Sequence, residues 1–186
     1  MGPILDSIKR RLLPPPTYWE KRQKFLYYQR VRELVQEVGR DSCSIIDIGT
    51  GECPYLDWFD WIPRRVSLDL RTPYRSAGVQ GIQADFLDWE NHERFDICLC
   101  LQVLEHIPDA ARFAQKLLTT APIVIVSVPH KWNPGRRGEH VHDPVDEGKI
   151  TGWFGRYPDK VILVREPTRR NRERMICYYG DDDSTP

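Results

Sequence analysis

One segment constrains the fold of this chain more than any other, residues 44–54, which read Ser-Ile-Ile-Asp-Ile-Gly-Thr-Gly-Glu-Cys-Pro. An apolar run passes through an acid, Asp47, into two closely spaced glycines, Gly49 and Gly51, and then a proline that can start a helix. A glycine-rich bend between a buried strand and a helix is typical of a nucleotide-type pocket at the carboxyl end of a first parallel strand. The segment therefore predicts an α/β fold with a cofactor site at that edge of the sheet.

The rest of the chain predicts strands that alternate with crossover segments. Strand-like runs recur at residues 44–49, 65–70, 81–86, 95–101 and 123–129. The first, fourth and fifth runs are almost wholly apolar, as strands covered on both faces should be. Two later runs, 160–164 and 174–179, are expected to pair with each other in antiparallel fashion. We therefore expect a Rossmann-like, doubly wound, mostly parallel seven-stranded sheet with a C-terminal antiparallel hairpin.

The length of 186 residues is enough for one domain with a sizeable core. We expect an N-terminal arm over residues 1–16, which ends in three prolines, and a single domain over residues 17–180. Residues 18–38 carry an interrupted helical pattern. A polar loop at about residues 130–155 is the expected substrate loop, and residues 181–186 form an acidic tail.

The amino-acid composition limits which binding partners and which cellular compartment are expected for this protein. Lys plus Arg and Asp plus Glu are equal at 27 each, and this neutral balance disfavours nucleic acid as the main partner. No apolar run approaches the length of a membrane span, and the amino terminus lacks a signal-peptide core. The five cysteines show no metal-type spacing, which favours buried thiols in a reducing compartment. We therefore expect a cytoplasmic protein without a membrane partner.

The glycine bend differs from that of a dinucleotide site. Pro54 occupies the position of the third glycine and has no N–H to offer a phosphate, and Asp47 would repel a phosphate but tolerate a cationic ligand. Asp69 ends the second strand about twenty residues past Gly49, the spacing expected for a carboxylate that accepts ribose hydroxyls. These residues argue against a nicotinamide dehydrogenase.

Two further landmarks complete a pattern. The third strand ends in Asp85-Phe86, and the fourth runs into Leu101-Gln102-Val103-Leu104-Glu105-His106. With the acid-x-Gly-x-Gly turn and Asp69, roughly residues 41–130 resemble the class I S-adenosylmethionine-dependent methyltransferases, and are most similar to small-molecule members of the ubiquinone-biosynthesis type. The resemblance implies an enzyme whose cofactor is S-adenosyl-L-methionine.

The resemblance also implies a role for each landmark. The turn with Asp47, Gly49 and Gly51 would lie against the methionine part of the cofactor, and Asp69 would bind the ribose. The remaining contacts are the adenine amine for Asp85, the purine for Phe86, and the sulfonium end for Leu101 and Gln102. Cys53, where many relatives have glycine, is the one departure.

Histidines gather in the loop that follows the fifth strand. His140 or His142 is our first candidate for the general base that takes a proton from the acceptor, and His130 is the next. Glu139, His140, His142 and Asp143 are alternatively all plausible metal ligands, but no second cluster fixes a geometry, so we expect no metal. Asp143 can instead cap the helix that follows.

Loop composition guides the choice of acceptor. Lys131 and Arg136-Arg137 would suit an anionic group on a substrate, and Trp132 could stack on a flat ring or a sugar. Residues 129–180 also loosely resemble methyltransferases of cell-surface polysaccharide and natural-product pathways. The sequence therefore predicts methyl transfer to a small molecule or sugar, on oxygen. A non-catalytic cofactor-binding scaffold and a nucleic-acid methyltransferase are the alternatives, although the Asn/Asp-Pro-Pro-aromatic motif of base-amino methylation is absent.

Overall fold

The computed structural model describes residues 17–90, 93–135, 139–167 and 172–181. Three predicted features lie outside the described residues: the arm over 1–16, the Arg136-Arg137 pair and the tail beyond 181.

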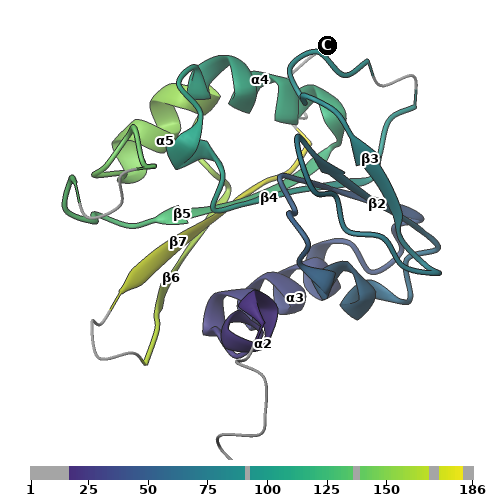
Figure 1. The fold of residues 1–186 in the computed structure, drawn as a ribbon. Helices are drawn as coiled ribbons and strands as arrows, with labels where there is room; N and C mark the ends of the chain where they lie inside the picture. Colours follow the sequence, from purple (N-terminus) through teal and green to yellow (C-terminus); the bar gives the residue numbers. More distant parts are fainter. Residues whose placement is uncertain (1–16, 91–92, 136–138, 168–171, 182–186) are drawn as a thin grey trace, which may run out of the picture.

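The core of the fold is one seven-stranded sheet with the order β3-β2-β1-β4-β5-β7-β6 (Figure 1). Its strands are β1 (Ser44–Ile48), β2 (Arg64–Asp69), β3 (Gln80–Gln83), β4 (Ile97–Leu101), β5 (Ile123–Pro129), β6 (Lys160–Arg165) and β7 (Glu173–Tyr179). Strand β7 is antiparallel to both of its neighbours, so the other six strands run in one direction. The predicted mostly parallel sheet with an antiparallel C-terminal hairpin is confirmed.

Helices cover both faces of the sheet, as Figure 1 shows. One face carries α2 (Tyr18–Arg22), α3 (Leu26–Val38) and the 3-10 helix η1 (Pro54–Phe59), and the other carries α4 (Ala110–Thr120) and α5 (Glu147–Phe154). Every residue of β1 and β4 is buried, because both strands lie between these two layers. The side chains form two core clusters, one on each face of the sheet.

Differences from the predicted elements have local causes. Strand β3 ends three residues early, because Asp85 turns the chain and its carbonyl accepts from the N–H groups of Asp88 and Trp89 at 3.2 and 2.8 Å. Helix α5 is capped by Asp146, whose side chain accepts from the Lys149 N–H, and Asp143 takes no part in that cap. No helix of the described part of the chain is long and apolar enough to cross a membrane.

Candidate active site

The glycine bend after β1 uses its two glycines for different purposes. Both have positive φ, 79° at Gly49 and 56° at Gly51, where residues with a side chain are strained. A Cβ at Gly49 would lie 2.5 Å from Cγ2 of Val103, whereas a Cβ at Gly51 would meet nothing within 4 Å. Gly49 therefore permits close packing against the turn after β4, and Gly51 leaves open space above the bend.

Asp69, at the end of β2, holds this bend in place. Its Oδ2 accepts from the Gly51 N–H at 2.9 Å, and its Oδ1 accepts from the N–H groups of Arg71 and Thr72 at 2.8 and 2.9 Å. A carboxylate offers about four acceptor positions. A ribose that donates two hydroxyls to Asp69 must therefore share or displace at least one of these backbone donors.

Asp47, inside β1, is a buried carboxylate. The residue is 1% exposed, and neither side-chain oxygen has a hydrogen-bond partner among the described residues. Burial raises the pKa of Asp47 to about 7; the nearby Thr50 and Tyr55 side chains oppose this rise, and the charge of Asp69 adds to it. The Thr50 hydroxyl donates to the main-chain oxygen of Asp47 at 3.0 Å. A cationic ligand group placed beside the bend would lower the energy of this buried charge.

A cavity of about 350 Å³ opens beside the glycine bend. Residues 50–53 of the bend are among its lining residues, and so are Leu101 and Gln102 at the carboxyl end of β4. Gln102 has a positive φ of 60° and its N–H donates to the Ser127 carbonyl at 2.8 Å, so the turn after β4 is tied to β5. The two segments that the sequence placed nearest the methionine and sulfonium parts of a cofactor therefore share one cavity.

Asp85 and Phe86 lie away from this cavity. Asp85 is exposed, and its Oδ1 accepts from the Leu87 N–H at 2.8 Å. Phe86 is 3% exposed and packs in the core, with its ring centroid 4.8 Å from that of Phe113. Neither residue is among those that line the cavity.

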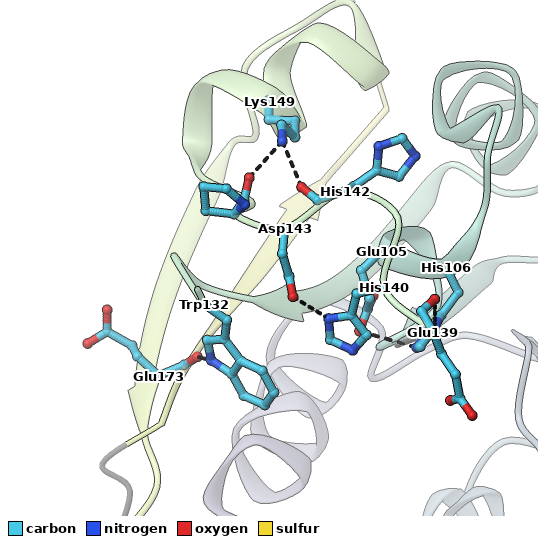
Figure 2. Close-up of polar contacts among 10 residues, drawn as sticks. Glu105, His106, Trp132, Glu139, His140, His142, Asp143, Lys149 and Glu173 are labelled. Atoms are coloured by element: carbon cyan, nitrogen blue, oxygen red, sulfur yellow. Dashed lines mark hydrogen bonds and ion pairs between the residues drawn. The ribbon is translucent and has the colours of Figure 1, made fainter. Parts of the chain in front are cut away.

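A polar cluster, drawn in Figure 2, also lines the cavity. Glu105 and His106 come from the 3-10 turn η2 (Leu104–His106) after β4, and His140 comes from the loop after β5. The His106 and His140 rings meet edge to face with centroids 4.7 Å apart. The backbone joins the two segments, because the Val141 N–H donates to the Glu105 carbonyl at 2.9 Å.

Each member of the polar cluster is oriented by its surroundings. Glu105 is 1% exposed, its Oε2 has no hydrogen-bond partner among the described residues, and burial raises its pKa to about 8. Nδ1 of His106 lies 2.9 Å from the carbonyl oxygen of Glu139. Nδ1 of His140 lies 2.8 Å from Oδ2 of Asp143, and both of these side chains are buried. Figure 2 shows both contacts.

An aromatic ring and an arginine form the side of the cavity next to this cluster. The Trp132 ring lies nearly parallel to that of His140, with centroids 6.0 Å apart, and its Nε1–H donates to the Glu173 carbonyl at 2.9 Å. Arg174 donates through Nε to Oε1 of Gln102 at 3.1 Å. The cavity therefore combines a flat apolar surface with charged and hydrogen-bonding groups.

Arg174 is held by a carboxylate that also begins a helix. Nη1 of Arg174 lies 3.2 Å from Oε1 of Glu166, and the side chains are 5% and 1% exposed. Helix α3 has no side-chain cap of its own, and Glu166 accepts from the N–H groups of Leu26 and Tyr27 at 2.8 and 3.2 Å. The single carboxylate of Glu166 therefore joins the first long helix to the closing hairpin at the wall of the cavity.

The three predicted catalytic histidines lie in different surroundings. His140 lines the cavity, and neither His130 nor His142 is among the lining residues. Nδ1 of His130 lies 2.6 Å from Oε1 of Glu173. Nε2–H of His142 donates to the Ile107 carbonyl at 2.7 Å, and its ring meets the edge of Trp153.

The acids and histidines that lie close together in the structure differ from those suggested by the sequence. Among the residues suggested as metal ligands, His140 alone belongs to a convergent group within the described part of the chain, and its neighbours there are Glu105 and His106. Sequence reasoning did not assign either residue to the site, although both stand in the turn after β4. The sequence analysis also did not identify Arg174 or Glu166 as site residues. The available signal was the position of Arg174 directly before an apolar run, because a charge at the start of a buried strand is unusual.

No protein-family profile matches the sequence, and no curated protein sequence matches it significantly. Solved structures do match. The 1,6-didemethyltoxoflavin-N1-methyltransferase of Burkholderia thailandensis, solved with 1,6-didemethyltoxoflavin and S-adenosylhomocysteine, is 17% identical, with a TM-score of 0.67 over 83% of this chain and 78% of that one. The N-methyltransferase NodS of Bradyrhizobium japonicum WM9, solved with S-adenosylhomocysteine, is 12% identical, with a TM-score of 0.69 over 96% and 98%.

A third match is the magnesium protoporphyrin IX methyltransferase ChlM of Synechocystis PCC 6803, solved with S-adenosylhomocysteine, at 18% identity and a TM-score of 0.59 over 95% and 94%. The small RNA methyltransferase HEN1 and the [4+2]-cyclase SpnF match with TM-scores of 0.61, at 16% and 12% identity. At these identities the likeness shows the fold: this chain has the class I methyltransferase fold, as the sequence resemblance predicted. Activity needs a separate argument, because a fold hosts more than one chemistry.

Proposed function

We propose that this chain, which has the class I methyltransferase fold, is an enzyme that transfers a methyl group from S-adenosylmethionine to a hydroxyl of a small molecule or sugar. One observation carries the proposal: a single cavity joins the glycine bend to a polar cluster that contains an ionisable acid and two histidines. The presence of S-adenosylhomocysteine in matched structures of the same fold supports the choice of cofactor.

The residues at the bend fit a cofactor that carries positive charge. Asp47 is a buried carboxylate without a hydrogen-bond partner in the described part of the chain, and open space lies over Gly51. We assign the ribose to Asp69 and the sulfonium end to Leu101 and Gln102. Asp85, which is exposed and follows β3 at the same edge of the sheet, remains the proposed adenine contact, whereas the ring of Phe86 packs against Phe113 in the core.

The cofactor supplies a methyl group that is already activated by the sulfonium, so the protein has to bind, align and deprotonate the acceptor. His140 is the proposed base. Because the Asp143 carboxylate can only accept, the 2.8 Å contact places the proton of neutral His140 on Nδ1 and the basic lone pair on Nε2. The acceptor proton passes to Nε2 as the acceptor oxygen forms its bond to the methyl carbon and the carbon–sulfur bond of the cofactor breaks, which leaves S-adenosylhomocysteine. His142 and His130 rank after His140, since their rings contact groups outside the cavity lining.

RNA is the second candidate acceptor, because a small RNA methyltransferase shares the fold. The zero net charge of this chain weighs against a long polyanion. The five cysteines, all free of disulfides, favour a reducing compartment such as the cytoplasm.

Calorimetry with S-adenosylhomocysteine tests the cofactor half of the proposal, and Asp69→Ala is the matched variant. We expect stoichiometric binding by the parent chain and weaker binding by the variant. Incubation with methyl-labelled S-adenosylmethionine and a panel of hydroxylated metabolites, sugars and short RNAs then tests the acceptor half. A well-folded protein that retains no cofactor would refute the proposed function.

A further inference from the structure

We infer that Glu105, His106 and His140 form a binding site for a divalent transition-metal ion at the acceptor end of the cavity. Each of the three residues offers one ligand atom, and these atoms all lie within 4.8 Å of one another. Metal bonds of about 2.0–2.2 Å place ligand atoms at most about 4.4 Å apart. Small side-chain rotations would therefore bring the three atoms onto one ion.

The hydrogen bonds behind the two histidines prepare them as ligands. A carbonyl oxygen only accepts, so the 2.9 Å contact with Glu139 puts the proton of neutral His106 on Nδ1 and the lone pair on Nε2. The Asp143 carboxylate imposes the same tautomer on His140. Histidine ligands in metal sites are held in this way, with the second ring nitrogen donating to a carboxylate or a backbone carbonyl (Figure 2).

Glu105 supplies an independent observation that points to a missing ligand. Its side chain is 1% exposed and faces the cavity, yet its Oε2 has no hydrogen-bond partner among the described residues. A buried carboxylate oxygen is costly unless a cation or a donor compensates it. Asp143 places a second carboxylate behind His140, so the two acids match the charge of one divalent ion.

The donor set selects the kind of ion. Two imidazoles and one carboxylate suit Mn²⁺, Fe²⁺, Co²⁺ or Zn²⁺, whereas Mg²⁺ and Ca²⁺ prefer oxygen ligands alone. Three protein ligands leave coordination positions open. Because all three residues line the cavity, those positions face the space in which the proposed acceptor would bind.

The role of the ion rests on the proposed function, although the binding site itself does not. A divalent ion held there would make the proton of a coordinated acceptor hydroxyl easier to lose to solvent, and the oxygen would then bond to the methyl carbon as the carbon–sulfur bond of the cofactor breaks. In the metal-bound protein His140 is a ligand, so its part in deprotonation becomes indirect.

Titration of EDTA-treated protein with Co²⁺ and with Zn²⁺, followed by visible absorption and calorimetry, tests the site. We expect one ion per chain and a Co²⁺ spectrum typical of nitrogen and oxygen ligands. Glu105→Gln, His106→Ala and His140→Ala should each weaken binding at least tenfold. His142→Ala is the matched control, because it removes an imidazole two residues from His140 that is not part of the cluster, and it should bind as the parent does. Mg²⁺ in excess should not displace Co²⁺.

Two outcomes would overturn the inference. One is a folded parent chain that binds neither ion stoichiometrically, a result that holds even if every variant fails to fold. The other is binding that survives all three ligand substitutions or is lost in the control. Calorimetry with S-adenosylhomocysteine on the same preparations separates the two proposals, because cofactor binding without metal binding refutes only the metal site, and the reverse result refutes only the proposed function.

Discussion

Replacing Asp47 by asparagine should change the stability of the cofactor-free protein in a pH-dependent way. The carboxylate is 1% exposed, without a hydrogen-bond partner in the described residues, and burial raises its pKa from 3.8 to about 7. Asparagine keeps the shape of the side chain and removes the ionisation. The variant therefore isolates the free-energy cost of charging this one position.

The sign follows from the order in which the two states lose the proton. Below about pH 4 the carboxyl is protonated in both states and adds no pH dependence. Between about pH 4 and 7 the unfolded chain is ionised while the folded protein must keep the proton, so the parent loses stability as pH rises. Above the folded pKa of about 7 the loss is complete and no longer grows.

The size of the effect follows from the same two pKa values. The rise from 3.8 to about 7 corresponds to at most about 4 kcal/mol, at 1.36 kcal/mol for each pKa unit. About 2–3 kcal/mol of this develops between pH 5 and pH 8. The difference in unfolding free energy between Asp47→Asn and the parent should grow by that amount, in favour of the variant.

Urea denaturation of both proteins at several pH values between 5 and 8 measures this difference. Other titrating groups are common to both chains and cancel in the comparison. Asp60→Asn, at an exposed carboxylate after η1, controls for the general effect of the substitution. Parallel stability profiles for Asp47→Asn and the parent would refute the reasoning. The same variant should bind S-adenosylhomocysteine about tenfold more weakly, since it no longer attracts a cationic group.

Three further results are expected. Asp69→Ala should weaken S-adenosylhomocysteine binding by about 1–3 kcal/mol in calorimetry, because ribose hydroxyls lose their acceptor, and an unchanged affinity would remove Asp69 from the site. His140→Ala should lower turnover far more than cofactor affinity in a labelled-methyl assay, whereas equal losses would indicate a structural role. Glu166→Gln should lower the unfolding free energy by about 3–5 kcal/mol, because Arg174 stays buried without its counter-charge, and the double variant with Arg174→Met should recover part of this loss in urea denaturation; no recovery would mean that the pair does not interact.

The sheet could be predicted from the sequence because its strands are continuous apolar runs. Ile45 and Leu99 are buried on one face of the sheet and Ile46 on the other, so these strands are apolar at successive positions and can be recognised from the sequence. The two acids could also be placed from the sequence. Because neighbouring parallel strands end at the same edge of a sheet, Asp47 and Asp69 were expected near one another at that edge. The sequence was less informative for Asp85 and Phe86. A two-residue motif does not reveal whether the carboxylate of the acid accepts a hydrogen bond within its own turn, or whether the aromatic ring packs in the core.

The polar cluster could not be predicted because it depends on the path of a loop. Glu105 and His106 meet His140 only through contacts such as the Val141 N–H bond to the Glu105 carbonyl, between residues far apart in the chain. Nothing in the local sequence of 130–146 indicates which of its histidines turns toward η2. The capping of α3 by Glu166 has the same character, because the helix start carries no capping side chain of its own.

The contact between Glu166, Arg174 and the start of α3 has a consequence for assembly during synthesis. Helix α3 is synthesised early, but Glu166, which accepts from its first N–H groups, comes much later in the chain. Arg174, which donates to Gln102, comes later still, in β7. Until residue 174 has been made, the cavity lacks the Arg174 side chain that forms part of its lining. A truncated product that stops before β7 therefore lacks both the antiparallel edge of the sheet and this part of the cavity lining.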